Sequence, residues 1–564
     1  MSIVRRAPRR TIAAVLAACA ALTAGDLAAQ PTGSVPAQIA AAAASTQVPR
    51  RKSAPDHGET QALRRVYEQR ANAPLWSVEG QPTPQARSLV RELQDADAYG
   101  LEVADYSGET LGKLSKAATV APGDEARSAQ FDADFDVKLS AAALRFMSDL
   151  HYGRVDPAAA GFKLQAAHAP LDLADALERL ASSADVRGTL ASVEPPFHHY
   201  QLLKDALARY RTLAQQPELT QLPAPPAKLK PGDAYSGAPA LRHLLIALGD
   251  LPAAGAAQAD APTFDAELSA GVRSFQQRHG LDADGVPGKT TFAALTTPLT
   301  HRVRQIDLTL ERWRWLPPFQ TPPIIVNIPQ FRLFAFRTTE DRVADILQMN
   351  VIVGKVFPRM QTPVFESDMR YVVIRPYWDV PRSILKNEML PKIRANPGYL
   401  AAQRLEIVSG DSDSSPVLPP TPANIEALAA GRLRVRQKPG EDNALGLIKF
   451  MFPNNFNVYL HSTPAHRLFQ ETVRTFSHGC IRVSDPLSLA VEVLKDAPGG
   501  WDRPKIDAAM HDDRTIRVNL TQPINVLILY GTALATEAGP VLFFHDIYGY
   551  DKRLERELGL KPGS

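Results

Sequence analysis

The stretch Ser477-His478-Gly479-Cys480-Ile481-Arg482-Val483 decides the fold around it. Its last four residues alternate in polarity, which predicts a β-strand whose successive side chains point to opposite faces. A second such segment, Phe456-Asn457-Val458-Tyr459-Leu460-His461, is separated from Ser477 by fifteen residues. We expect one face to be buried with Phe456, Leu460, Ile481 and Val483. If the two strands are neighbours, the opposite face carries a phenol, an imidazole, a thiol and a guanidinium, from Tyr459, His461, Cys480 and Arg482.

Cys480 has the surroundings of a nucleophile. A free thiol is mostly protonated at neutral pH, and a neighbouring base or cation makes it reactive. His461 can supply the base, and Gly479, which has no side chain, lets a substrate carbonyl approach backbone N–H groups that would stabilise an oxyanion. The alternative is a buried, inert cysteine, against which stand the flanking His478 and Gly479 and the nearby Arg482. His478 is either a second base or a residue that shapes the turn.

Short β-branched and aromatic segments around this motif predict a mostly β domain over residues 303–505. They are PIIVNIPQFRLFAF, ILQMNVIVGK, MRYVVIRPYWDV, FNVYLH and CIRV. An insertion rich in Asp, Pro and Ser, with helical pieces, interrupts them at residues 384–442. Residues 506–564 form a C-terminal segment with one more apolar strand candidate, INVLILYGTALA, and a charged, helix-like end.

The part of the chain before residue 303 has helical periodicity. Segments between 57 and 230 carry apolar residues three and four apart, which predicts a helical scaffold domain. A Pro-rich linker then leads into a compact unit over residues 231–300. Its Leu248-Gly249, Phe275-Gln276, His279-Gly280-Leu281 and Asp284-Gly285 segments resemble the three-helix peptidoglycan-binding module. A structural copy of that module without ligand binding is the alternative.

Composition limits the classes of function. The 564 residues are too many for one core, so several domains are expected. Apolar residues at 45% and charged residues at 22% are typical of a globular chain. Without residues 1–29, the chain keeps 59 of its 63 basic and 59 of its 60 acidic side chains, so there is no general electrostatic case for nucleic acid. The two cysteines, Cys19 and Cys480, exclude a disulfide framework and a cysteine-based zinc site.

The amino terminus predicts export. Residues 1–29 have a basic start, an apolar run from Thr11 to Ala24 and then small residues, which is typical of a cleaved secretory signal. Leu16-Ala17-Ala18-Cys19 also resembles a lipobox, so a lipid anchor on Cys19 is the alternative. Residues 30–56, rich in Ala, Pro, Gln and Ser, predict a flexible tether.

His461 followed by Ser477-His478-Gly479-Cys480 and Arg482 resembles the signature of L,D-transpeptidases. The segments Pro376-Tyr377-Trp378-Asp379-Val380-Pro381, Asn443-Ala444-Leu445-Gly446 and Lys449-Phe450 resemble the large form found in Gram-negative bacteria, although Arg375 stands where Asn is expected. The resemblance implies a multi-domain α+β chain. A mostly β catalytic domain with a helical cap insertion over the donor site would accompany the α-helical scaffold domain and the small three-helix module.

The resemblance also implies acyl transfer between peptidoglycan stem peptides. Cys480 would attack the bond between the third residue, a diamino acid, and the fourth, D-Ala, of a tetrapeptide stem. D-Ala would leave a thioester, which an amine of a second stem resolves. His461, held by backbone near Ser462, would move the proton, with Tyr459, Trp378 and Arg482 lining the pocket.

The same resemblance implies the setting of this reaction. No metal or other cofactor is expected, and carbapenems would acylate Cys480. We expect a periplasmic protein, anchored to a membrane only if Cys19 is lipidated, whose candidate partners are cell-wall synthases and carboxypeptidases. Two alternatives stay open: the same site acting as an L,D-carboxypeptidase or amidase, and a non-catalytic cell-wall-binding scaffold, against which the pair of His461 and Cys480 argues.

Overall fold

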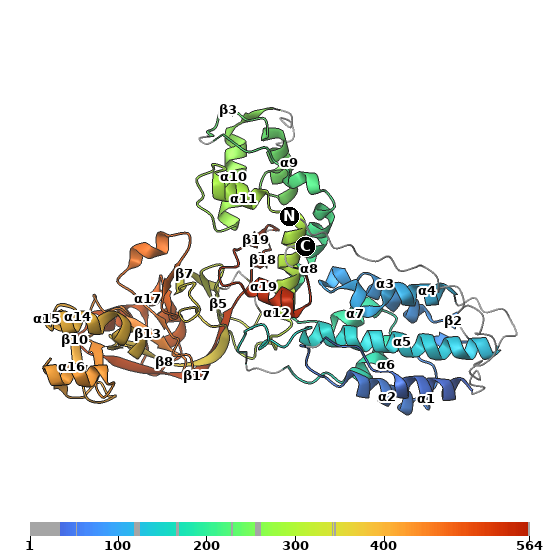
Figure 1. The fold of residues 1–564 in the computed structure, drawn as a ribbon, viewed down its shortest axis with the longest axis horizontal. Coiled ribbons are helices and arrows are strands. Elements are labelled where there is room, and N and C mark those ends of the chain that lie inside the picture. Colours follow the sequence, from blue (N-terminus) through green and yellow to red (C-terminus); the bar gives the residue numbers. More distant parts are fainter. Residues whose placement is uncertain are drawn as a thin grey trace, which may run out of the picture.

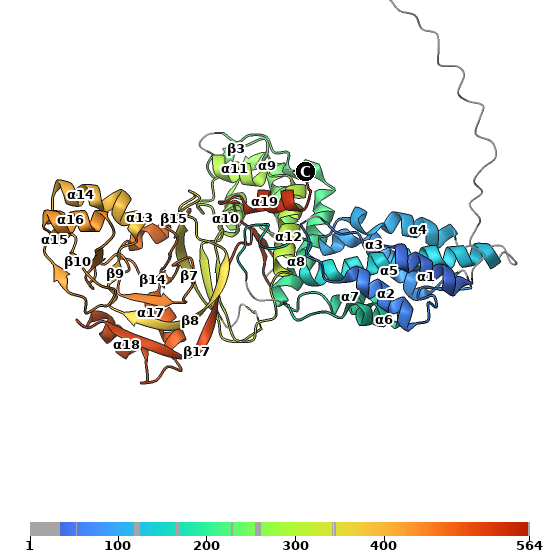
Figure 2. The same ribbon diagram turned by 60° about the horizontal axis from the view of Figure 1, so that its bottom comes forward.

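The computed structural model describes residues 34–561 apart from residues 52, 80, 118–124, 165–167, 227–228, 254–260, 341, 343–345 and 538. The predicted export signal at residues 1–29, with Cys19, lies outside the described residues. The chain forms a long helical part, a small helical module and a β-rich part (Figure 1). The β-rich part and the long helical part lie at opposite ends of the molecule in both views (Figures 1 and 2).

A closed sheet of eight strands forms the β-rich part. Its order around the ring is β7, β16, β14, β13, β8, β17, β5 and β6, with β6 pairing back to β7; β15 adds to β7 outside the ring. Closure removes free sheet edges and fixes the register of every strand. The strands are β5 (Ile324–Asn327), β6 (Arg332–Phe336), β7 (Ile346–Gly354), β8 (Phe365–Ile374), β13 (Ile448–Met451), β14 (Leu460–His461), β15 (Thr475–Ser477), β16 (Ile481–Val483) and β17 (Ile516–Leu529).

The closed sheet continues past residue 505, the predicted end of the catalytic domain. Strand β17 lies between β8, to which it is antiparallel, and β5, to which it is parallel. Without its fourteen residues the ring would be open, so the domain extends at least to Leu529. Helices α17 (Pro486–Leu494) and α18 (Arg503–His511) connect β16 to this strand, and α17 adds Leu489, Ala490, Val493 and Leu494 to the core of the sheet.

The predicted insertion is a separate cap with its own sheet and core. Its strands run in the order β11 (Val417–Leu418), β10 (Leu405–Val408), β12 (Arg434–Gln437) and β9 (Trp378–Asp379). Its helical elements are α13 (Arg382–Ile384), the π-helical η6 (Leu385–Met389), α14 (Leu390–Ala395), α15 (Gly398–Ala402) and α16 (Pro422–Ala429). Because β9 pairs with β12, the cap begins six residues before the predicted residue 384.

The long helical part surrounds α5 (Glu125–Tyr152). Its other elements are α1 (Val35–Ser45), α2 (Glu59–Gln69), β1 (Ser77–Val78), β2 (Gln81–Pro82), α3 (Pro84–Gln94), η1 (Ala96–Tyr99), η2 (Val103–Tyr106), α4 (Gly108–Ala117), α6 (Leu173–Ser182) and α7 (Val186–Ala191). The prediction of a flexible tether over residues 30–56 is wrong where α1 forms. Ile39 and Ala43 of this helix are buried in the same core as α5, because an alanine-rich segment is a strong helix former as well as a linker composition.

Helix α8 (His198–Ala214) is assigned from the sequence to the scaffold domain, but its apolar residues belong to a different core from that of the long helical part. It shares an apolar core with α12 (Leu299–Trp313), with the hairpin of β18 (Ala533–Ala535) and β19 (Val541–Phe543), and with the small module. The module contains β3 (Asp233–Ala234), α9 (Ala238–Leu248), β4 (Thr263–Phe264), α10 (Ala266–Arg278) and α11 (Lys289–Leu295), preceded by η3 (Pro217–Thr220). The predicted boundary at residue 230 therefore cuts a continuous core.

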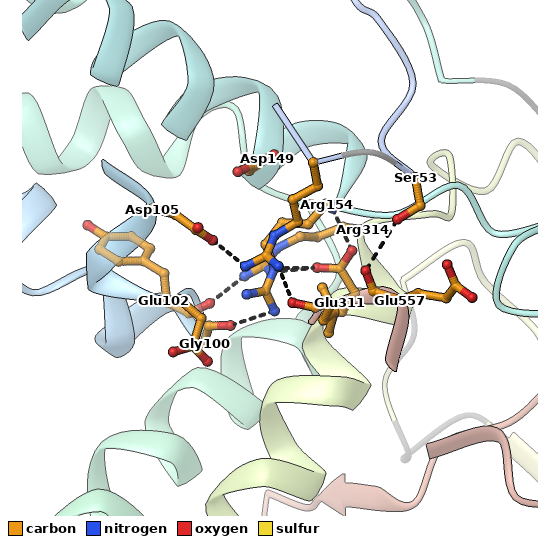
Figure 3. Close-up of polar contacts among 12 residues, drawn as sticks. Ser53, Gly100, Glu102, Asp105, Asp149, Arg154, Glu311, Arg314 and Glu557 are labelled. Atoms are coloured by element: carbon orange, nitrogen blue, oxygen red, sulfur yellow. Dashed lines mark hydrogen bonds and ion pairs between the residues drawn. The ribbon is translucent and has the colours of Figure 1, made fainter. Parts of the chain in front are cut away.

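A buried ionic junction joins the long helical part to α12 (Figure 3). The backbone N–H and the side chain of Arg154 donate to the Glu311 carboxylate, at 2.5 and 3.2 Å. Arg314 lies 3.4 Å from the same carboxylate, and the Arg154 guanidinium also reaches the Gly100 carbonyl. Ser53 donates to the carbonyl of Glu557 in the C-terminal helix α19 (Tyr550–Glu557), 3.2 Å away. These contacts hold the helical part on the helix that leads into the sheet.

Candidate active site

The closed sheet brings the two predicted segments together. Strands β14 and β16 are parallel neighbours, with Leu460 opposite Ile481 and His461 opposite Arg482. Leu460, Ile481 and Val483 are fully buried in the core of the sheet. Cross-strand partners share a face, so His461 and Arg482 lie on the face opposite that core.

One part of the predicted alternation is wrong. Only Leu460 and His461 are in strand β14, and the Phe456 side chain is 40% exposed instead of buried. Asn457 has a backbone φ of 54°, in the left-handed region, which ends the strand geometry on its amino side. The turn affects the site directly: the Asn457 carbonyl oxygen accepts a hydrogen bond from the Cys480 thiol, at a sulfur–oxygen distance of 3.5 Å.

Cys480 immediately precedes β16 and is partly accessible to solvent. The hydroxyl and the backbone N–H of Tyr459 are both hydrogen-bond partners of its sulfur. Burial raises the pKa of the Cys480 thiol above its usual value, while Tyr459 and the Arg482 guanidinium act in the opposite direction. Burial, and after it Cys480, also raises the pKa of Tyr459. Both groups therefore carry their protons in the resting site.

His461 is buried and held by backbone. Its Nδ1 lies 2.5 Å from the Ser462 carbonyl oxygen, which requires a proton on Nδ1 and leaves Nε2 as an acceptor in the neutral ring. Burial and, after it, the Arg482 guanidinium lower the pKa of His461 to about 3, although hydrogen bonding to the backbone of Ser462 and Leu445 acts in the opposite direction. The Tyr459 and His461 rings meet edge to face, with centroids 5.7 Å apart. The resting site thus holds a neutral imidazole, paired with the Ser462 carbonyl, and a neutral thiol, paired with Tyr459 and the Asn457 carbonyl.

One further charged residue, Lys449, belongs to this site, and the sequence alone gave it no role. Lys449 of β13 is the register partner of His461 on its other side. Burial lowers the pKa of Lys449, while Asp379 and Asp413 of the cap raise it. Lys449 also contributes to the low pKa of His461. The alternation of apolar and polar residues over 448–451 could have predicted from the sequence which face of the strand carries Lys449.

Gly479 holds the turn before the nucleophile. Its φ of 120° lies in the region that favours glycine, and its carbonyl accepts from the Thr362 hydroxyl at 2.8 Å. Its N–H, expected from the sequence to face an oxyanion, instead donates to the Ser477 hydroxyl at 3.1 Å. An oxyanion would meet this N–H only if that internal hydrogen bond opened.

The remaining predicted residues lie toward the cap. His478 is exposed, and its Nε2 is 2.8 Å from Glu388 of the π-helical turn η6. Trp378 lies in β9 and packs against the apolar core of the cap, while the next residue, Asp379, acts on both Tyr459 and Lys449. Sequence had offered His478 as a second base or as a turn residue, and its contact with Glu388 ties the motif to the cap.

The described part of the chain has neither a metal-binding cluster nor a membrane-spanning helix. There, no group of three or more His, Cys, Asp or Glu side chains is arranged to hold a metal ion. Among the helices that the structure describes, none has the length and apolarity needed to cross a bilayer.

Three family models match the chain. Residues 61–207 match a model described as “Scaffold domain”, residues 237–295 one described as “Putative peptidoglycan binding domain”, and residues 322–499 one described as “L,D-transpeptidase catalytic domain”. A Haemophilus influenzae protein named “Putative L,D-transpeptidase” is 32% identical over 260 residues. That alignment covers 46% of this chain and 50% of the relative, so the chain spans about half the length of the curated relative it matches.

Proposed function

The chain carries an L,D-transpeptidase catalytic domain and a peptidoglycan-binding domain, and we propose that it crosslinks peptidoglycan stems through a thioester on Cys480. One observation carries the proposal. Adjacent, register-fixed strands of the closed sheet present the partly exposed thiol beside Tyr459 and bring His461 opposite Arg482 on the face away from the core.

The first step forms the thioester. The Cys480 sulfur attacks the carbonyl between the diamino acid and D-Ala, and the thiol proton passes to Nε2 of His461. The tetrahedral intermediate then collapses, the C–N bond breaks, and His461 returns the proton to the departing D-Ala amine. The hydrogen bond from Nδ1 to the Ser462 carbonyl fixes the tautomer that this exchange requires.

The second step releases the product. The side-chain amine of a diamino acid in a second stem attacks the thioester carbonyl, the C–S bond breaks, and the proton lost by the amine returns to sulfur through His461. The product joins two third-position residues, and the thiol is regenerated. Water in place of the amine gives a tripeptide stem instead, which is the hydrolytic alternative at the same site.

The setting follows from the substrate. Peptidoglycan stems lie outside the cytoplasmic membrane, and residues 1–29 have the pattern of a secretory signal. We place the mature protein in the periplasm of a Gram-negative cell, next to the synthases and carboxypeptidases that make and trim stems. Acylation of Cys480 by carbapenems follows from the same nucleophile.

The proposal is tested with purified full chain, tetrapeptide muropeptides and mass spectrometry of the products. Wild type is expected to give dimers with loss of D-Ala. The Cys480→Ala variant should give none, and His461→Asn should lose at least about a hundredfold in rate, the usual size of a general acid–base contribution. His466→Asn, a change of an exposed histidine nearby, is the matched control and should retain activity.

Each outcome of the product analysis has one interpretation. Tripeptide monomers without dimers would replace transfer by hydrolysis. Dimers formed by Cys480→Ala would overturn the mechanism, and binding of isolated sacculi without any product from wild type would favour the non-catalytic scaffold.

A further inference from the structure

A cleft of about 560 Å³ separates the small module from the catalytic domain. The module contributes the loop over residues 279–283, which follows α10, and the catalytic domain contributes the loop over residues 469–474. The walls are completed by residues 329–331, Asn350, Phe544, His545 and Ile547. The Thr472 hydroxyl donates to the Asp282 carboxylate, so the two loops meet directly.

The lining combines aromatic rings with uncharged hydrogen-bonding groups. Three phenylalanine rings, from Phe331, Phe469 and Phe544, line it together with the amides of Gln330, Asn350 and Gln470. Burial lowers the pKa of His279 and of His545, with Arg302 contributing in both cases, so both imidazoles are neutral at pH 7. Ligand sites commonly have such apolar walls with a few placed polar groups.

The charges in the cleft select against an anion. Its two carboxylates come from Asp282 and Glu471, whereas the one guanidinium, of Arg474, is turned to protein groups. Arg474 donates to the backbone carbonyls of Val351, Phe331 and Glu471, at 2.8 to 3.1 Å. An anionic ligand would therefore meet two carboxylates and a cation that is already engaged.

The cleft is continuous with the nucleophile along the chain. The loop over residues 469–474 runs into β15, whose last residue, Ser477, begins the Ser-His-Gly-Cys motif. The Ser477 carbonyl accepts from the N–H of Lys355, and the Arg474 carbonyl accepts from the N–H of Val353. A ligand in the cleft therefore lies against the segment that leads directly to Cys480.

We propose that this interdomain cleft binds the saccharide backbone of peptidoglycan, a neutral chain of N-acetylated amino sugars, while a stem attached to it extends toward Cys480. The inference rests on the proposed function and adds the glycan as a second recognition element. Sugar hydroxyl and acetamide groups suit the exposed Gln470 amide, the amide N–H groups of Gln330 and Asn350, and the neutral imidazoles. The oxygens of Gln330 and Asn350 already accept from Asn327 and Arg332. The apolar parts of the sugar rings suit the phenylalanines. Stem peptides carry free carboxylates, which the lining disfavours.

Binding is measured by calorimetry with the full chain carrying Cys480→Ala, so that no turnover occurs. The probe is a preparation of peptide-free glycan strands, and free tetrapeptide is the competitor. We expect saturable binding that the tetrapeptide does not displace. The double variant Gln470→Ala/Glu471→Ala should weaken it about tenfold, the loss expected for two hydrogen-bonding side chains. Both residues are exposed, so folding is retained.

Gln215→Ala/Glu218→Ala removes the same groups from an exposed site outside the cleft and should leave binding unchanged. Absence of glycan binding, binding unaffected by Gln470→Ala/Glu471→Ala, or displacement by tetrapeptide would each overturn the proposal. Carbapenem acylation of Cys480 is measured in parallel on chains with the native thiol and should be equal with and without the cleft variant. Loss of glycan binding with acylation intact overturns the cleft alone, whereas failure of wild-type acylation overturns the proposed function.

Discussion

Under the proposed function, we expect the buried imidazole to make the rate of Cys480 acylation nearly independent of pH on the acid side. Burial, followed by Arg482, lowers the pKa of His461 to about 3. At pH 5 an ordinary imidazole, with a pKa of about 6.5, would be only about 3% neutral. At the same pH His461 is almost entirely neutral and able to accept the thiol proton. An ordinary histidine would therefore lose about thirtyfold in rate between pH 7.5 and pH 5, and this site should lose less than about twofold.

The assay is the second-order rate constant for carbapenem acylation, followed by intact mass from pH 4.5 to 8. This constant reports ionisations of the free enzyme. Near-ultraviolet circular dichroism at each pH checks that the fold is retained. A fall of about thirtyfold with a midpoint near pH 6.5 would refute the reasoning, because it would mean that His461 is hydrated like a surface residue.

Arg482→Gln extends the same test, with the profile followed below pH 4.5 and above pH 8, where the limits set by His461 and Cys480 lie. The Arg482 guanidinium lowers the pKa of both His461 and Cys480. Its removal should move the acid and the alkaline limits of the profile upward together. A shift of the alkaline limit alone would show that Arg482 acts on the thiol and not on the imidazole.

Three further predictions concern the frame of the site. Asp136→Ala removes the acceptor of the Leu75 and Trp76 backbone N–H groups and should destabilise the helical part by about 4 kcal/mol, seen as a lower thermal midpoint; an unchanged midpoint would contradict it. Ile39→Asp places a charge in a fully buried position of α1 and should expose residues 34–57 to limited proteolysis, whereas equal protection of wild type and variant would argue against docking of α1. Glu388→Ala breaks a partly exposed pair with His478 worth less than about 1 kcal/mol, so carbapenem acylation should fall less than about fivefold; a larger loss would assign the pair a dominant role in holding the cap.

The sequence predicts the two faces of a short strand better than the limits of a domain. Alternation over residues 480–483 is a local property, and the structure buries Ile481 and Val483 in the core while His461 and Arg482 face each other across the strands. Domain limits depend on distant pairing instead. Strand β17 closes the ring between β8 and β5, and its partners are more than a hundred residues away in the chain. No local pattern in residues 516–529 identifies those partners.

The details missed within the site have a similar cause. The Asn457 carbonyl contacts the sulfur because one residue adopts a left-handed backbone conformation. The Gly479 N–H is engaged because the Ser477 hydroxyl turns back on it. Each depends on a single torsion, and residue type only makes such a torsion permissible. Likewise, the alanine-rich composition of residues 35–45 suits both a linker and a helix, and only the apolar surface of α5 selects the helix.

The electrostatics of the resting site favour a thiol that reacts only when substrate is bound. Burial holds the pKa of Cys480 high and that of His461 low, so proton transfer between them is strongly unfavourable in the empty site. Arg482 and Lys449 are the cations that lower the pKa of His461. An anionic group of a substrate that paired with either cation would weaken this effect and raise the basicity of the imidazole. In the free enzyme the thiol then stays protonated, which limits its oxidation, because the thiolate is the reactive form. Because Arg482 and Lys449 lower the basicity of His461 in the free enzyme, the activation of His461 depends on the charge of the ligand that binds beside them.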